Sequence, residues 1–171
     1  MDLAARIRDI PDFPSPGVVF KDITPLLGDA AAFAATIDAL ATPYEDAAVT
    51  KVAGTEARGF ILAAPVAHRF GAGFVPVRKA GKLPWEIERQ EYELEYGTDL
   101  LEIHRDAIGV GERVLVVDDV LATGGTAAAT ARLVEKLGGT VVGFAFLIEL
   151  TFLDGRAVLG DHPITSLITY V

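Results

Sequence analysis

Two kinds of apolar pattern alternate along the chain. The runs "RVLVV" (113–117) and "TVVGFAFLIEL" (140–150) are almost continuously apolar, which is typical of strands buried on both faces of a parallel sheet. Between them, apolar residues recur at helical spacing over 126–137, and Gly138 follows where a helix would end. This strand–helix–strand rhythm predicts an α/β fold with right-handed crossover connections.

The rest of the chain fits the same architecture. Three more helices are expected, over residues 3–9, 29–40 and 60–70. Three more strands are expected, over residues 47–53, 74–78 and 166–170. Asp29 can cap the second helix, and Pro76 would place its strand at a sheet edge or a bulge. Residues 79–90 are expected to form a polar loop, and the alternation over 91–97 indicates a half-exposed ribbon. We therefore expect a mostly parallel twisted sheet flanked by helices, in a single domain over 1–171.

Composition and charge narrow the possible functions. The chain has 171 residues, 51% of them hydrophobic and none of them cysteine, which indicates a globular protein without disulfides or thiol chemistry. Its longest strongly apolar stretch is too short to span a bilayer, and the first residues lack a signal-peptide core. We therefore expect a soluble, cytoplasmic protein with no membrane partner. The net charge of −9 argues against a nucleic-acid partner, and the three widely spaced histidines suggest no metal site.

The stretch "VLVVDDVLATGGTA" (114–127) carries the most specific chemistry. Asp118 and Asp119 come directly after the buried strand, although adjacent carboxylates repel each other and are costly to desolvate. A bound group must therefore account for them. The loop that follows leads into a helix, and its free N–H groups and hydroxyls suit a phosphate monoester. The residues of this loop are Ala122, Thr123, Gly124, Gly125 and Thr126. No lysine follows the glycines, so the loop is not a P-loop.

Basic side chains follow two other strands. Ligands of open α/β sheets bind at the carboxyl ends of strands, so we expect these cations to meet the acidic pair. They are Arg58, Arg78, Lys79 and Lys82. A solvated basic turn is the alternative for the last three. The carboxylates suit the 2,3-diol of a ribose, the loop suits its 5′-phosphate, and the cations suit a more highly charged anion. Together these groups describe phosphoribosyl pyrophosphate.

The same residues resemble a known family. "VLVVDDVLATGGT" looks like the phosphoribosyl pyrophosphate signature of type I phosphoribosyltransferases. Over nearly its full length, the chain resembles the adenine-specific branch of that family. The supporting stretches are "IPDFPSPGVVFKDITPLL", "EARGF", "FVPVRKAGKLP", "YELEYGTD" and "GFAFLIEL". The resemblance implies the type I fold, with a flexible flap over 79–96 and a small N-terminal base-binding segment. It also implies conversion of adenine and phosphoribosyl pyrophosphate to AMP and pyrophosphate, in purine salvage.

The resemblance further implies roles for single residues. Asp118 and Asp119 would bind the ribose hydroxyls and belong to the catalytic centre, and Glu95 would handle the purine proton. Phe20 would stack on the base. The adenine pocket would contain Val19, Phe20, Lys21 and Leu150. Mg²⁺ is the implied cofactor, held mainly through substrate oxygens and not by a protein ligand set. A homodimer is also implied.

Several alternatives remain open at this stage. The base could be hypoxanthine, guanine, xanthine or orotate, because base discrimination depends on donors and acceptors that the sequence does not position. A regulator that binds RNA or DNA would need an added basic surface, which this acidic chain lacks. Core packing is the alternative for Phe20, and a plain acidic ribbon is the alternative for Glu95. Lys21, Ala80 and Trp85 depart from the usual residues of the family.

Overall fold

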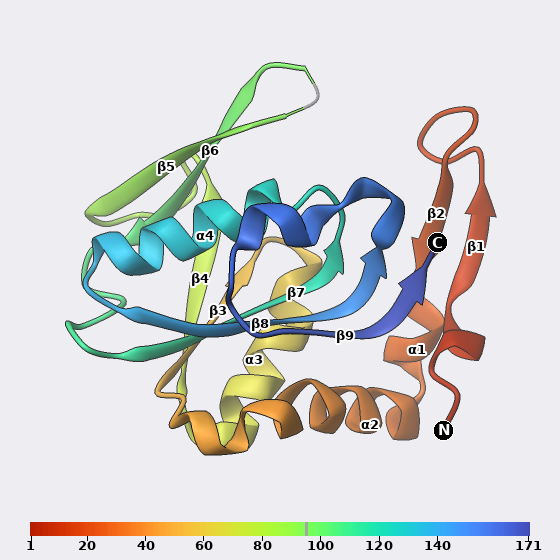
Figure 1. Ribbon diagram of the computed structural model, residues 1–171, viewed down its shortest axis with the longest axis horizontal. Coiled ribbons are helices and arrows are strands. Elements are labelled where there is room, and N and C mark those ends of the chain that lie inside the picture. Colours follow the sequence, from red (N-terminus) through yellow and green to blue (C-terminus); the bar gives the residue numbers. More distant parts are fainter. Residues whose placement is uncertain (95) are drawn as a thin grey trace.

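The computed structural model describes residues 1–94 and 96–171, and within them the sheet is mostly parallel. Seven strands form one sheet in the order β5–β6–β4–β3–β7–β8–β9 (Figure 1). These strands are β3 (Lys51–Thr55), β4 (Gly73–Lys79), β5 (Ile87–Glu93), β6 (Thr98–His104), β7 (Arg113–Leu121), β8 (Thr140–Leu150) and β9 (Ile164–Tyr170). β3, β4, β7, β8 and β9 are parallel, whereas β5 and β6 form an antiparallel ribbon beside β4. The expected α/β architecture is therefore confirmed.

Helices cover both faces of this sheet. The α-helices are α1 (Thr24–Gly28), α2 (Ala30–Ala41), α3 (Arg58–Phe70) and α4 (Gly125–Lys136). The 3-10 turns are η1 (Ala4–Arg6), η2 (Thr42–Ala47), η3 (Thr151–Leu153) and η4 (Gly155–Leu159). One buried cluster joins α4 to the sheet, and a second cluster joins α1, α2 and α3 to it. None of the described helices is long and apolar enough to cross a membrane.

β7 shows why the central strands are continuously apolar. Val114 and Val116 pack in the cluster that contains α4, whereas Leu115 and Val117 pack in the cluster that contains α3. Successive side chains of a strand point to opposite faces, so a strand covered on both sides needs apolar residues at every position. The same alternation holds in β8 from Phe144 to Leu147. The predicted buried strands at 113–117 and 140–150 are therefore confirmed, but β7 continues to Leu121, so the acidic pair expected after the strand lies within it.

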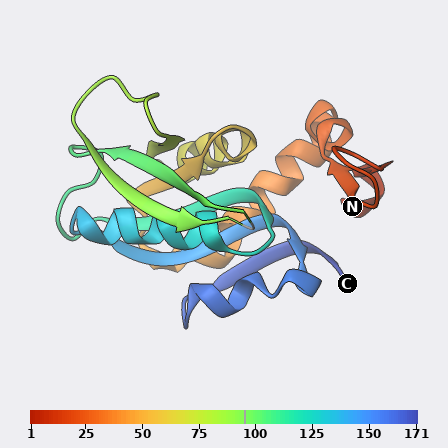
Figure 2. The ribbon, with the colours of Figure 1, turned by 90° about the horizontal axis from the view of Figure 1, so that it is seen from above.

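The N-terminal segment forms a separate antiparallel ribbon of β1 (Arg8–Pro11) and β2 (Val19–Asp22). It stands apart from the main sheet (Figures 1 and 2). Lys21 ties it to the end of β9, because its Nζ lies 2.7 Å from Asp9 Oδ1 and 3.9 Å from the centre of the Tyr170 ring. This contact holds the ribbon near the carboxyl ends of the parallel strands.

Some predicted elements are wrong in type or extent. The helix expected over 3–9 is a short 3-10 turn, η1, followed by β1, because Pro11 and the pairing with β2 favour an extended chain. Pro76 lies on β4, which is an inner strand of the sheet and not an edge strand. In the described chain, however, β6 pairs with β4 only at Arg78 and Lys79, so Pro76 has a strand neighbour on one side alone. The strand expected over 47–53 begins at Lys51, and β5 takes up the last part of the expected loop.

Candidate active site

The loop between β7 and α4 has the form of an anion cradle. Gly124 has φ of +85° and precedes α4, whose first turn has no side-chain cap. The backbone N–H groups of Gly125, Thr126 and Ala127 find no acceptor among the described residues. A cavity of about 90 Å³ lies against this loop and is also lined by Asp118. Free N–H groups at the positive end of a twelve-residue helix are suited to a phosphate.

The segment η4 packs closely against the cradle. A side chain at Gly124 would come within 2.5 Å of the Gly155 carbonyl oxygen, and one at Gly155 within 2.3 Å of the Ala122 carbonyl oxygen. The segment η4 is held by Arg156, whose Nε and second guanidinium nitrogen each donate to the Glu149 carboxylate at 2.7 Å. The hydrogen bonds from Arg156 lower the pKa of Glu149, which keeps it charged. The two glycines therefore permit a close approach that fixes the shape of the loop.

Asp118 and Asp119 lie at the end of β7, next to the cradle. Thr55 Oγ1 donates to Asp118 Oδ2 at 2.6 Å, and the Asp119 N–H donates to Asp118 Oδ1 at 2.9 Å. Gly59 leaves room for this carboxylate, because a side chain there would come within 2.6 Å of Asp118 Oδ1. Burial, and next the charge of Asp119, raise the pKa of Asp118 to about 8. The pair is thus costly to ionise without a ligand, as the sequence indicates.

Arg58 occupies a place that the sequence does not reveal. Its Nε lies 2.8 Å from Asp119 Oδ2, and its guanidinium carbon lies 4.9 Å from the centre of the Phe20 ring. The Nε–H is not aligned for a hydrogen bond, and Asp119 Oδ2 has no hydrogen-bond partner in the described chain. Arg58 therefore joins the acidic pair to the N-terminal ribbon. It stands apart from Arg78, Lys79 and Lys82, the other cations predicted to bind the pyrophosphate.

The other predicted cations gather at the end of β4. Glu56 accepts a hydrogen bond from the Lys79 N–H at 2.7 Å and another from Lys82 Nζ, and Arg78 Nε lies 3.4 Å from its Oε1. Burial would raise the pKa of Glu56, but the bonds from Lys82 and Lys79 and the nearby positive charges lower it overall. Lys79 Nζ points elsewhere and lies 3.4 Å from Asp99 Oδ2. This basic turn, residues 78–82, is therefore rich in internal ion pairs.

The residues predicted to bind adenine come from two elements. Val19, Phe20 and Lys21 lie on β2, and Leu150 ends β8. Phe20 is half-buried and packs edge-on against Phe13, with ring centres 5.2 Å apart. Val19 is exposed, and the Lys21 ammonium is engaged by Asp9 and Tyr170. The Lys21 ammonium is therefore already paired within the protein.

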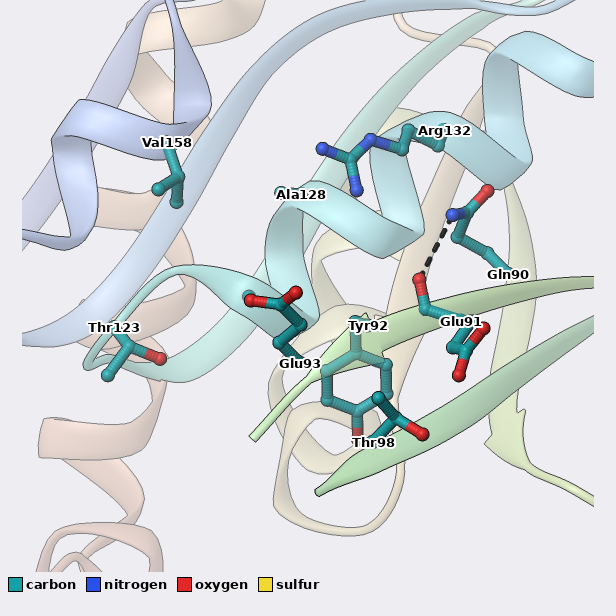
Figure 3. A pocket seen from close by; sticks show the side chains of 10 residues that line it. Gln90, Glu91, Tyr92, Glu93, Thr98, Thr123, Ala128, Arg132 and Val158 are labelled. Carbon is teal, nitrogen blue, oxygen red and sulfur yellow. Dashed lines mark hydrogen bonds between the residues drawn. The ribbon is translucent and has the colours of Figure 1, made fainter. Parts of the chain in front are cut away.

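A larger cavity lies beside the cradle, under the ribbon of β5 and β6. Its volume is about 720 Å³, and Figure 3 shows Tyr92 and Thr98 from the ribbon, Thr123 from the cradle, Arg132 from α4 and Val158 from η4 around it. The buried Tyr92 lies next to the cradle, because it lines a cavity together with Thr123, Gly125 and Thr126. The expected ribbon over 91–97 is thus part of a hairpin that covers the cradle. Glu95, predicted to handle the purine proton, lies outside the described residues.

Two residues of the site make contacts that could not be assigned from the sequence, although Glu56 stands out there beside Arg58 at the end of a predicted strand. Thr55 binds Asp118, and Glu56 contacts three members of the basic turn. Both belong to "GTEARG", which is visible in the sequence as a polar loop at a strand end. Their position at a strand end is a sequence signal for a functional role. Their contacts with Asp118 and with the basic turn follow only from the parallel pairing of β3 with β4 and β7.

Comparison with known proteins agrees with this geometry. Residues 23–159 match the family model described as the phosphoribosyl transferase domain. The chain therefore belongs to the phosphoribosyltransferase family. Among curated relatives, the adenine phosphoribosyltransferase of Myxococcus xanthus is 60% identical over 169 residues, which cover 99% of this chain and 92% of the relative.

Solved structures point to the same branch. The crystal structure of adenine phosphoribosyltransferase from Thermoanaerobacter pseudethanolicus is 57% identical, with a TM-score of 0.96 and coverage of 99% of this chain and 98% of that one. The Saccharomyces cerevisiae enzyme, complexed with an imino-altritol bisphosphate and adenine, is 42% identical, with a TM-score of 0.92 and coverage of 97% and 96%. Within the family, the chain thus groups with the adenine phosphoribosyltransferases.

Proposed function

We propose that this protein transfers the 5-phosphoribosyl group of phosphoribosyl pyrophosphate to adenine, forming AMP and pyrophosphate in purine salvage. The observation that carries this proposal is the position of Asp118 and Asp119 directly beside a loop of unbonded N–H groups. Carboxylates accept hydrogen bonds from a diol, and free N–H groups at a helix N-terminus bind a phosphate. Asp118 and the loop line the same cavity, so both could contact one phosphorylated sugar. The high identity to adenine phosphoribosyltransferases supports adenine as the base.

In the reaction, N9 of adenine bonds to C1′ of the ribose, and the bond from C1′ to the pyrophosphate oxygen breaks. The electron pair of that bond leaves with pyrophosphate, and the proton of the purine leaves to a base, for which Glu95 is our candidate. Asp118 and Asp119 would hold the ribose hydroxyls and favour the positive charge that develops on the sugar. The cradle, residues 122–126, would fix the 5′-phosphate, while Arg78, Lys79 and Lys82 would serve the pyrophosphate. The hairpin of β5 and β6 would exclude water.

The residues present fit Mg²⁺ as the cofactor. Within residues 1–94 and 96–171, no three His, Cys, Asp or Glu side chains are grouped so that they could hold a metal ion. Asp118 and Asp119 are adjacent, and in the described chain Asp119 Oδ2 has an ion-pair contact with Arg58 Nε at 2.8 Å but no hydrogen bond. One or two carboxylates together with substrate phosphates are the usual ligands of Mg²⁺. The bound ion supplies positive charge that offsets the charge on the departing pyrophosphate.

We also propose a single domain over 1–171, a cytoplasmic location and a homodimer. Support for the homodimer comes from an apolar surface at the start of α3 and on β4. Ile61 and Phe74 are exposed there, and the rings of Phe60 and Phe74 lie 5.6 Å apart. Arg78 lies 5.9 Å from the Phe60 ring, so an interface at this surface would adjoin the basic turn.

A comparison of bases tests the proposed function. The purified protein is incubated with phosphoribosyl pyrophosphate and Mg²⁺, and nucleotide formation is measured with adenine, hypoxanthine, guanine, xanthine and orotate under identical conditions. We expect AMP to form fastest by a wide margin. A faster rate with any other base, or no nucleotide at all, contradicts the proposal.

A further inference from the structure

The four cations predicted to bind pyrophosphate all have acidic neighbours within the protein. Arg58 lies beside Asp119, and Lys79 lies beside Asp99. Arg78 and Lys82 differ from these two because they converge on one carboxylate, that of Glu56. The same carboxylate also accepts a hydrogen bond from the Lys79 N–H at 2.7 Å. Glu56 is thus the common partner of the turn that follows β4.

Exposure differs sharply between Glu56 and its partners. The Glu56 side chain is 10% exposed, whereas those of Arg78 and Lys82 are 35% and 46% exposed. The carboxylate is therefore covered by the turn, while the two cations keep an open side toward solvent. An incoming anion can reach the cations without displacing Glu56.

A second carboxylate holds the same turn from β6. Glu102 accepts a hydrogen bond from the Gly81 N–H at 2.7 Å, and Arg89 donates to its other oxygen at 2.9 Å. Its side chain is 3% exposed. Gly81 has φ of +83°, so the turn needs glycine at this point. Glu56 and Glu102 therefore both hold the backbone of the turn. Of these two carboxylates, only Glu56 also pairs with cationic side chains of the turn itself, those of Arg78 and Lys82.

We propose that Glu56 is a positioning residue, which assembles the pyrophosphate subsite before substrate arrives by holding Arg78, Lys82 and the Lys79 backbone in one arrangement. This inference rests on the proposed function. Two cations brought together without a ligand repel each other, and a shared carboxylate offsets that repulsion. A subsite ordered in advance loses less conformational freedom when it binds its anion. Removal of the Glu56 charge therefore weakens the binding of pyrophosphate, even though one repulsive carboxylate has been removed from its neighbourhood.

The first test is Glu56→Gln, which keeps the shape of the side chain and an acceptor for the Lys79 N–H but loses the charge. We expect the KM for phosphoribosyl pyrophosphate to rise about tenfold or more, as is typical when a charged hydrogen-bonding partner is lost. The KM for adenine and kcat should change little. Titration of inorganic pyrophosphate with Mg²⁺, followed by calorimetry, should show a Kd raised by the same factor. The matched control is Glu135→Gln, which changes an exposed glutamate on α4, away from the basic turn.

A double-mutant cycle separates positioning from a general structural effect. If Glu56 acts through Lys82, Glu56→Gln should raise the KM much less in a Lys82→Met background than in the wild type. If the changes in KM caused by the two single substitutions simply multiply in the double mutant, the inference is wrong. It is also wrong if Glu56→Gln leaves the KM unchanged or lowers it. Glu56→Asp keeps the charge on a shorter side chain and should give a KM between those of the wild type and Glu56→Gln. It replaces Glu56→Gln as the test if that variant does not fold. A wild-type protein that forms no AMP instead contradicts the proposed function.

Discussion

Arg58 Nε lies 2.8 Å from Asp119 Oδ2, and the guanidinium of the same side chain lies over the ring of Phe20. One cation thereby connects the carboxylate proposed for the ribose with the ring proposed for the base. The contact crosses from α3 to β7 and β2, which are far apart in the sequence. Substrate must therefore bind next to Arg58 or displace it.

This geometry gives a prediction that differs from the one based on sequence. Arg58→Ala should raise the KM for adenine as well as the KM for phosphoribosyl pyrophosphate, each by about tenfold, because it removes a charged partner from both regions. Steady-state kinetics with each substrate varied in turn measures the two values.

A matched control is Arg69→Ala, which removes an arginine that pairs with Asp38 and Glu45 away from the site. It should leave both KM values unchanged. A rise confined to phosphoribosyl pyrophosphate in Arg58→Ala would instead support the original assignment of Arg58 to pyrophosphate alone.

The pKa of Asp118 predicts how stability depends on pH. Burial, with the charge of Asp119, raises this pKa from 3.8 to about 8 in the folded protein. Between these values the folded state binds more protons at Asp118 than the unfolded state does, so this group makes the protein less stable as pH rises. Asp118→Asn removes the titration and should flatten that part of the profile, by about 1 to 3 kcal/mol between pH 5 and pH 8.

Urea unfolding of the wild type and Asp118→Asn across this range provides the measurement. Glu149, with its lowered pKa, contributes stability that is lost only at more acidic pH, so it does not mask the effect. If the free energy of unfolding depends on pH in the same way for both proteins, burial does not disfavour the charged form of Asp118.

The cradle predicts a sensitive glycine. Gly124→Ala should raise the KM for phosphoribosyl pyrophosphate and lower the free energy of unfolding by about 1 to 3 kcal/mol. The reasons are its φ of +85° and the 2.5 Å approach of the new Cβ to the Gly155 carbonyl oxygen and Val158. Kinetics and urea unfolding check both effects.

Gly28→Ala is the comparison, because Gly28 ends α1 without a positive φ and with no atom within 4 Å of its Cβ position. That variant should behave like the wild type. A Gly124→Ala protein with normal KM would mean that the cradle does not bind the phosphate.

Much of the fold could be predicted from sequence because its signals are local. The apolar run of β7, the Asp118–Asp119 pair and the glycines before α4 lie within fourteen consecutive residues, 114–127. Asp29 caps α2 as expected, with its side chain accepting from the Ala32 N–H. Signals of this kind need no knowledge of distant segments.

The remaining features depend on contacts between distant segments. The pairing of Arg58 with Asp119 and the binding of three groups by Glu56 follow from the parallel order β4–β3–β7, which no single stretch encodes. For the same reason, the N-terminal residues form a ribbon and not the expected helix. Pairing of β1 with β2 satisfies backbone groups that a helix would otherwise satisfy internally.

In the proposed function, the acidic pair and the cradle together bind a phosphorylated ribose. A crystal structure of the protein soaked with ribose 5-phosphate tests it most directly. We predict that the phosphate accepts hydrogen bonds from the N–H groups of Gly125, Thr126 and Ala127, while Asp118 and Asp119 accept from the ribose hydroxyls. An empty cradle, or a sugar bound with both aspartates turned away from it, would contradict the account.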